Sequence, residues 1–311
     1  MPRLLRGTAA ATEARGRQVR KLTRRAGQLA YVIRHAVDHS ECAEAIWQSG
    51  VGADRRTSLK YLGNYVALSL ATSERLQTLT HHYRQLAQRL GRVAAVELTS
   101  GLVLWRRRFD DLHPRLEVRL ERAIRGRMEG ELQVRVQFGH DLFWLTFLIA
   151  PGYLFGSASE SVLFVGGLQG RENARSEIRQ ASKLNGEIDP AAMALLALKA
   201  IGRALDIREI IGVRDDDQIA DCECRTQGRY SRFWKAHGGR RRGSYYCFPV
   251  IAESSPLSAI PRSHRRRTKK KRQAKRLIRQ SIERQLKRVI ASSHEGTTAL
   301  PICVSHPGTV S

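Results

Sequence analysis

The feature that most restricts the fold is an alternating hydrophobic pattern in the middle of the chain. In ELQVRVQF (131–138), apolar residues alternate with polar ones, which is typical of a half-buried strand. Two more apolar runs, at 143–149 and 161–167, follow after turn residues and predict two further, more deeply buried strands. Because the connections are short, we expect the three strands to pair as an antiparallel meander.

Residues 142–159 carry no charge over 18 positions, a length that also fits a membrane-spanning helix. Pro151-Gly152 interrupts this run, which favours two strands joined by a turn, so we expect no integral membrane span. Downstream, helices are predicted at 171–184 and 190–205, followed by a strand at 209–213. A strand reached through a helical crossover should lie parallel to the strand that precedes the crossover.

The first 125 residues contain three stretches in which apolar residues recur at helical spacing: Val19, Leu22, Ala26, Leu29, Ile33 and Val37; Leu76, Leu79, Tyr83, Leu86 and Leu90; and Leu116, Leu120 and Ile124. We therefore expect an α+β protein with an N-terminal helical subdomain at 1–125 and an α/β core, a mixed sheet with flanking helices, at 126–260. A basic amphipathic helix is predicted at 261–291, and a loose tail at 292–311.

The charge balance is strongly basic, with 54 Lys and Arg against 29 Asp and Glu and a net charge of +25. Residues 262–290 alone hold 14 Lys or Arg and one acid, a net charge of +13. This predicts an anionic partner, in the first place tRNA or other RNA. The cations expected to contact nucleic acid are Arg265, Arg266, Arg267, Lys269, Lys270, Lys271, Arg272, Lys275, Arg276 and Arg279.

The cysteines are five in number and scattered, which is not typical of a disulfide scaffold. Cys222 and Cys224 form a C-x-C pair, but no second pair or nearby histidine completes a metal site, so no metal is expected. The first residues lack the apolar core of a secretory signal. We therefore expect reduced thiols and a cytoplasmic location.

The motif GGLQG (166–170) carries the most information locally, because glycines between a strand and a predicted helix leave backbone N–H groups uncovered. Such groups suit a phosphate, a carboxylate or a developing oxyanion. Gly167, Gln169 and Gly170 are therefore candidate catalytic residues; the alternative is a turn that needs small residues only for packing. The spacings of the Walker and dinucleotide-binding loops are both absent.

Five further residues are candidates for binding a substrate. Arg171 and Lys183, at the two ends of the helix predicted after GGLQG, are placed to hold phosphates of a donor, although Lys183 fits a helix C-terminal cap equally well. Tyr230, Phe233 and Trp234 fall in an Arg-rich segment predicted to be a loop. They are candidates for an acyl or acceptor pocket; the alternative is that they anchor the loop to the core.

Several segments together resemble the VirK/YbjX family of bacterial proteins: THHYRQL (80–86), LFVGGLQG (163–170), ASKLNG (181–186), and YSRFW followed by GG (230–239). The family's motif continues with Thr-Lys, His-Gly and Leu-Arg-Pro, where this chain has Ser182-Lys183, Asn185-Gly186 and Glu187-Ile188-Asp189-Pro190. The His and Arg are thus replaced, and a later His is absent from DDDQIAD (215–221). The resemblance implies an association with bacterial virulence and the cell envelope, but no reaction.

The predicted strand order is similar to the central part of the GNAT acyltransferase fold, in which the last two strands splay apart and expose backbone donors that hold the donor substrate. The coenzyme A loop of that fold, Q/R-x-x-G-x-G/A, is absent, and GNAT-like enzymes without it include transferases that use aminoacyl-tRNA. By this analogy we expect transfer of an aminoacyl group from aminoacyl-tRNA to a small amine or hydroxyl acceptor, with no cofactor and no identified general base. The alternative is a non-enzymatic RNA-binding or envelope-associated regulator.

Overall fold

The structure, a computed structural model, describes residues 4–51, 56–124, 126–219, 228–251 and 256–295. Its α-helices are α1 (Leu4–Arg34), α2 (Ala36–Gln48), α3 (Thr72–Ser100), α4 (Arg175–Leu184), α5 (Pro190–Ala204), α6 (Arg229–Ala236) and α7 (Arg262–Glu295). Its strands are β1 (Leu102–Arg107), β2 (Leu116–Arg122), β3 (Leu132–Phe138), β4 (His140–Pro151), β5 (Ser161–Gly170), β6 (Glu209–Gly212), β7 (Arg240–Arg242) and β8 (Tyr245–Pro249). Short 3-10 helices occupy Thr57–Leu62, Gly152–Phe155 and Leu257–Ala259.

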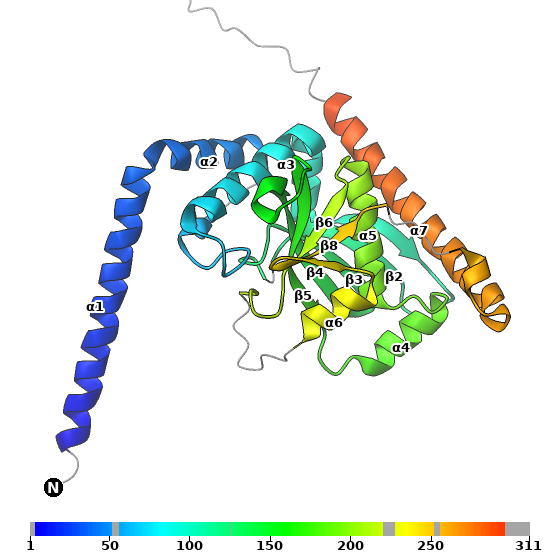
Figure 1. Cartoon of the computed structure of the whole chain (residues 1–311), viewed down its shortest axis with the longest axis horizontal. Coiled ribbons are helices and arrows are strands. Elements are labelled where there is room, and N and C mark those ends of the chain that lie inside the picture. The colour runs from blue at the N-terminus through cyan, green and yellow to red at the C-terminus, as the bar shows by residue number, and fades with distance from the viewer. Residues whose placement is uncertain (1–3, 52–55, 125, 220–227, 252–255, 296–311) are drawn as a thin grey trace, which may run out of the picture.

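The strands form one mixed sheet in the order β1-β2-β3-β4-β5-β6-β8-β7, with helices on both sides (Figure 1). Strands β1 to β5 are antiparallel neighbours, whereas β5 and β6 are parallel. The meander predicted over 131–167 and the parallel strand after the helical crossover are both confirmed. The chain is an α+β protein, as predicted.

The helix predicted around Leu116, Leu120 and Ile124 is wrong. Residues 116–122 form β2, which pairs with β1 and β3. A spacing of four residues is close to one helical turn, but it is also two repeats of a strand. The charged residues between the leucines complete the strand alternation, and the sheet therefore takes its first two strands from within residues 1–125.

The sheet carries a helix on each face. On the apolar face, α5 comes close to the sheet at Gly202, where an added Cβ would press on Val250 and Leu163. Helix α3 lies on the other face, where the Tyr83 hydroxyl donates to Glu131 just before β3 (2.6 Å). The start predicted for α5 is confirmed, because the Asp189 side chain accepts from the Ala192 N–H (2.8 Å).

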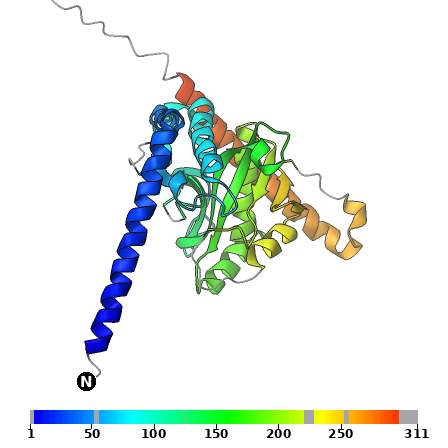
Figure 2. The same cartoon turned by 60° about the vertical axis from the view of Figure 1, so that its left-hand side comes forward.

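The basic helix predicted at 261–291 is confirmed as α7, which packs along the outside of the body against α5, α3 and β1. Near its end, Ser293 Oγ accepts from the N–H of Ala94 (2.8 Å), and the close approach falls at Gly91, whose φ of +72° kinks α3. Helix α1 instead projects away from the body (Figures 1 and 2). Among the described residues, no helix has the length and apolar character needed to cross a bilayer.

Candidate functional site

Strands β5 and β6 are paired only over a short stretch. Residues 163–165 pair with 210–212, and β5 then continues to Gly170 beside β4 alone. A β-bulge at Gly166 shifts the register with β4 at the point where β5 leaves β6. Two parallel strands that part in this way expose one edge of β5 to side chains or to a ligand.

The motif GGLQG does not form the predicted turn. It is the second half of β5, and α4 begins only at Arg175, so the expected cradle at a helix N-terminus is wrong. Strand β4 is long enough to pair with Gly167 to Gly170, and backbone groups that would be costly to leave unpaired stay in the ladder. Gln169 is exposed and accepts from Trp144 Nε1 (3.0 Å), and Gly170 lies opposite Phe143.

The carboxyl group of Glu129 lies against this part of β5. Glu129 is only 8% exposed, and a Cβ added to Gly167 would overlap its Oε2 atom. A Cβ added to Gly166 would overlap its backbone oxygen. Burial raises the pKa of Glu129 from 4.5 to about 7. The close approach explains the two glycines, and it leaves a carboxyl group that exchanges a proton near neutral pH.

Tyr230 reaches the open edge of β5 from α6. Its hydroxyl oxygen accepts from the N–H of Leu168 (3.0 Å), so its own proton remains to be donated. Burial, and then the charge of Glu129, raise the pKa of Tyr230. The loop predicted here is wrong, because the Asp215 carboxylate accepts from the N–H groups of Tyr230 and Ser231 (2.7 and 3.0 Å) and caps a helix.

The other two aromatic residues of α6 have different surroundings. Trp234 is fully buried over Gly212, and its Nε1 donates to the backbone oxygen of Val213 (2.8 Å). This ring anchors α6 to the core, which is the alternative left open by the sequence. Phe233 is half-buried and stacks on Phe143, with 6.2 Å between ring centroids, beside the end of β5.

A short segment, Tyr65–Ser69, crosses the gap between β5 and β6, and we call it the strap. At one end the Val66 N–H donates to the backbone oxygen of Met128 (2.8 Å). At the other, Ser69 donates through its N–H and its hydroxyl to the Asp217 carboxylate (2.6 and 2.8 Å). A hollow of about 360 Å³ opens beside this second end, between Leu68, Ser69 and the residues that follow β6.

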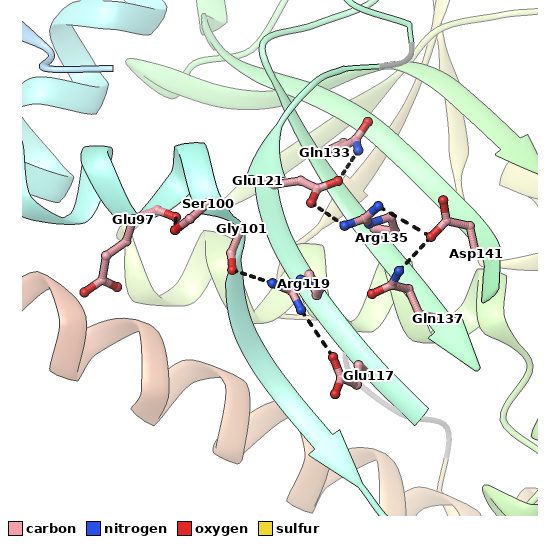
Figure 3. Close-up of polar contacts among 10 residues, drawn as sticks. All are labelled: Glu97, Ser100, Gly101, Glu117, Arg119, Glu121, Gln133, Arg135, Gln137 and Asp141. Atoms are coloured by element: carbon pink, nitrogen blue, oxygen red, sulfur yellow. Dashed lines mark hydrogen bonds and ion pairs between the residues drawn. The ribbon is translucent and has the colours of Figure 1, made fainter. Parts of the chain in front are cut away.

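The polar face of β2, β3 and β4 carries a row of hydrogen bonds (Figure 3). Glu121 is buried and accepts from Gln133 and from Arg135 (2.8 Å). The strand register places Gln133 beside Thr146, and Thr146 beside Gly167. Thr146 Oγ1 is buried and has no hydrogen-bond partner within the part of the chain that the structure describes. Thr146 and the Glu129 carboxyl group both lie where a Cβ on Gly167 would be, so this unpartnered hydroxyl is close to Glu129.

Glu131, two residues from Glu129, shows what a structural carboxylate looks like in this fold. It accepts from Lys60 Nζ (2.7 Å) and from the hydroxyls of Tyr65 and Tyr83 (2.8 and 2.6 Å). These three donors satisfy the Glu131 carboxyl group and tie it to α3 and to residues 60–65. At Glu129, burial is the cause of the raised pKa.

The two adjacent histidines of α3, His81 and His82, have packing roles and are not suited to proton transfer near pH 7. Burial lowers the pKa of His81 to about 4 and that of His82 to about 3, so both are neutral at pH 7. His82 Nδ1 accepts from the N–H of Ile149 (3.1 Å), and His81 Nε2 lies 3.0 Å from Ser161 Oγ. Both bonds fasten α3 to the sheet.

A second feature is a hollow of about 510 Å³ between α5, α6 and α7, which we call the basic groove. Its cations are Lys199 of α5 and Arg272, Lys275, Arg276 and Arg279 of α7, and His237 after α6 also lines it. Lys199 and His237 also line an adjoining hollow of about 1120 Å³ beside the arginines of β7. Burial, and then repulsion from Lys275 and Arg279, lower the pKa of Lys199.

The basic groove is short of negative charge. No ion pair formed within the described ranges includes Lys199, Lys275 or Arg279. The charge of Asp189 acts on Lys275 and His237, and that of Glu283 acts on Arg279, but Asp189 already caps α5 and Glu283 already pairs with Arg203 and Lys287. Neighbouring cations without acidic partners attract an anionic ligand.

The cations predicted to contact nucleic acid from α7 differ in their surroundings. Arg272, Lys275, Arg276 and Arg279 line the basic groove, whereas Arg266, Lys269 and Lys270 are exposed. Arg267 pairs with Glu187, and Arg265 donates to the backbone oxygens of Ile260 and Ser258 (2.8 and 3.1 Å), so these two hold the start of α7. Arg171 and Lys183 are exposed around α4 and are not among the residues lining this groove.

The described residues contain no group of three or more metal-ligating side chains placed to hold an ion. Cys42 and Cys247 are free and buried. The pair Cys222 and Cys224 lies outside the described residues, as does most of the tail predicted at 292–311.

The sequence of the chain matches one protein family. A family model described as a protein of unknown function, DUF535, matches residues 18–284. The chain belongs to the DUF535 family. No curated protein and no solved structure matches it. The DUF535 match covers every described strand, Glu129 and the basic groove.

Sequence reasoning missed Glu129, Thr146 and Lys199. The local signal for Glu129 is an acid between Gly126 and Gly130 just before a buried strand, which is too common to single it out. Thr146 lies inside an apolar run, and Lys199 is one polar residue in a helix that is otherwise mostly buried. Their surroundings come from segments far away in the chain.

Proposed function

We propose that this DUF535 protein is an acyltransferase whose reaction takes place between β5 and β6, with Glu129 as the general base. The observation that carries the proposal is the buried carboxyl group with a pKa near 7, held against the open edge of β5. A base is most effective when its pKa lies near the working pH. The GNAT analogy comes from strand order, and the short pairing between the parallel strands β5 and β6 supports it.

In the proposed reaction, an acceptor amine attacks the carbonyl carbon of an aminoacyl ester. The new C–N bond forms as the C–O bond to the ribose of the tRNA breaks. Glu129 takes the proton that the amine loses, and the Tyr230 hydroxyl supplies the proton that the departing ribose oxygen gains. Proton return from Glu129 to Tyr230 restores the starting state, and the Thr146 hydroxyl is placed to orient the acceptor.

The basic groove supports aminoacyl-tRNA as the donor, since an RNA brings phosphates that uncompensated cations bind. Helix α6 connects the two sites: Tyr230 lies in its first turn and His237 follows its last, about 10 Å further along at 1.5 Å per residue. We place the reaction in the cytoplasm, where aminoacyl-tRNA is formed. Within DUF535, the motifs around GGLQG and YSRFW support a place among VirK/YbjX-like proteins.

The test is transfer of labelled amino acids from charged tRNA to a mixture of small amines, with the products identified by mass spectrometry. Glu129→Gln should lower kcat/KM by about 10²–10⁴-fold and abolish its rise with pH through 7. Glu97→Gln, at an exposed carboxyl of α3, is the matched control and should leave the rate unchanged. If the wild-type chain transfers nothing from any charged tRNA, the proposal is wrong.

Glu129 should also make stability depend on pH. Its pKa is about 7 in the folded chain and near 4.5 when unfolded, so the folded chain binds more protons between these values and loses stability as pH rises. The loss is on the order of 3 kcal/mol at pH 8. Glu129→Gln should remove it, so urea unfolding should show the variant gaining stability over wild type at pH 8 but not at pH 4.5. A difference that does not change with pH would mean that the carboxyl group is solvated.

The basic groove by itself favours a second candidate, an RNA-binding regulator without catalysis. In that case Glu129→Gln would leave every function of the chain intact, whereas loss of the groove cations would abolish RNA binding. Sequencing of the RNA that co-purifies at low salt separates the two candidates further. Enrichment of tRNA supports the transferase, and enrichment of messenger RNA supports the regulator.

A further inference from the structure

Helix α1 projects from the body and leaves its apolar side exposed. Val19, Leu22, Leu29 and Ile33 are between 58% and 67% exposed, and with Ala26 they form one line along the helix, which we call the apolar stripe. Gln28, Tyr31 and Val32 are the partly buried residues among the described side chains of this helix. Gln28 Nε2 donates to the backbone oxygen of Leu62 (3.2 Å), and the Tyr31 ring lies 6.1 Å from that of Tyr61.

The apolar stripe is flanked by cations. Between Gln18 and Val37 the chain has five cations, Arg20, Lys21, Arg24, Arg25 and Arg34, and no acid. At 100° per residue these cations lie beside or opposite the apolar stripe. A helix with an apolar side and cationic flanks binds at the interface of an anionic bilayer, with its apolar residues among the acyl chains.

We propose that the apolar stripe docks α1 on the surface of an anionic lipid bilayer. The charge pattern argues for lipid over a second copy of this chain, because two copies of the segment 18–37 side by side would bring ten cations together with no acid between them. The way α1 projects from the body leaves the stripe accessible (Figure 2). Helix α7 is also basic and amphipathic, but its apolar face is buried against α3 and α5 and is not available to lipid.

The experiment uses the full chain, freed of nucleic acid at high salt, in flotation with vesicles of phosphatidylcholine alone or mixed with phosphatidylglycerol. The wild-type chain should float only with the mixed vesicles. Leu29→Ser keeps the charge and should weaken this binding by about tenfold, the cost of losing one inserted leucine. Leu277→Ser is the matched control, since Leu277 is 57% exposed on α7, and it should bind as wild type does.

Three results would overturn the proposal. The first is no flotation with the mixed vesicles. The second is flotation that Leu29→Ser leaves unchanged, which would assign binding to charge alone. The third is a wild-type chain that does not float and is a dimer by light scattering, while the combined variant Leu22→Ser, Leu29→Ser and Ile33→Ser is a monomer. The apolar stripe would then bind a second copy of the chain. Circular dichroism of each variant confirms that the fold is retained.

Discussion

Helices α1 and α7 share one kind of sequence pattern but differ in what surrounds them. Both are long, basic and amphipathic, but α7 buries Ile278, Ile282 and Leu286 in the core, whereas α1 leaves its apolar stripe in solvent. The same kind of pattern therefore serves to hold the body together in one helix and to meet a partner in the other. An amphipathic pattern identifies the apolar side of a helix, but it does not say what covers that side.

The largest expected difference is in stability. Ile282 is fully buried, so Ile282→Ala should lower the free energy of unfolding by about 2–5 kcal/mol, whereas Leu29→Ala, at 61% exposure, should change it by no more than about 0.5 kcal/mol. Urea unfolding followed by tryptophan fluorescence, to which buried Trp234 contributes, measures both. Equal losses would show that α1 also packs on the body in solution.

The next difference is in RNA binding. Lys275→Gln, Arg276→Gln and Arg279→Gln together should reduce the slope of log K for tRNA against log salt by about two to three units, since each cation neutralises one phosphate. The matched variant with Lys21→Gln, Arg24→Gln and Arg25→Gln removes the same charge from α1. Fluorescence anisotropy over a series of salt concentrations should show little change for it. A similar loss in both variants would mean that RNA binds to diffuse charge rather than to the basic groove.

The smallest difference concerns Lys199. Burial and its cationic neighbours lower its pKa, so the unfolded chain holds this proton more tightly and the charged form costs stability at neutral pH; the cost is relieved as pH rises towards 10.5. Lys199→Gln should therefore raise Tm by about 2 °C or less at low salt. It should also reduce the stabilisation that added phosphate gives the wild-type chain. Lys21→Gln on α1 should do neither, and thermal unfolding with and without phosphate decides.

The strands that the sequence predicts correctly are those whose hydrophobic pattern fits a strand and does not fit a helix. In β3, Leu132, Val134 and Val136 alternate with polar residues, and no helix accommodates that period. In β2, the leucines at 116 and 120 fit both periods, and only pairing with β1 and β3 selects the strand. The glycines of GGLQG were read as a turn because nothing local shows that β4 extends far enough to pair with them.

The candidate site was less accessible to sequence reasoning than the fold. Tyr230 was selected for its type and neighbours, and the structure brings it to Leu168, which is 62 residues away in the chain. Glu129 was not selected, because a carboxyl group becomes a base near neutral pH only when other segments bury it. Here those segments include β5, through Gly166 and Gly167, and the strap, through the bond from Val66 to Met128.

The sequence by itself determined the central meander, the parallel crossover strand and the basic C-terminal helix, because periodicity and connection length are local properties of the chain. The tertiary structure alone decided the pKa of Glu129, the convergence of Lys199 with the cations of α7, and the exposure of the apolar stripe on α1. Each of these depends on which groups the folded chain buries, exposes or brings together. Burial and the distances between charges are set by neighbours that are remote in sequence and meet only when the chain has folded.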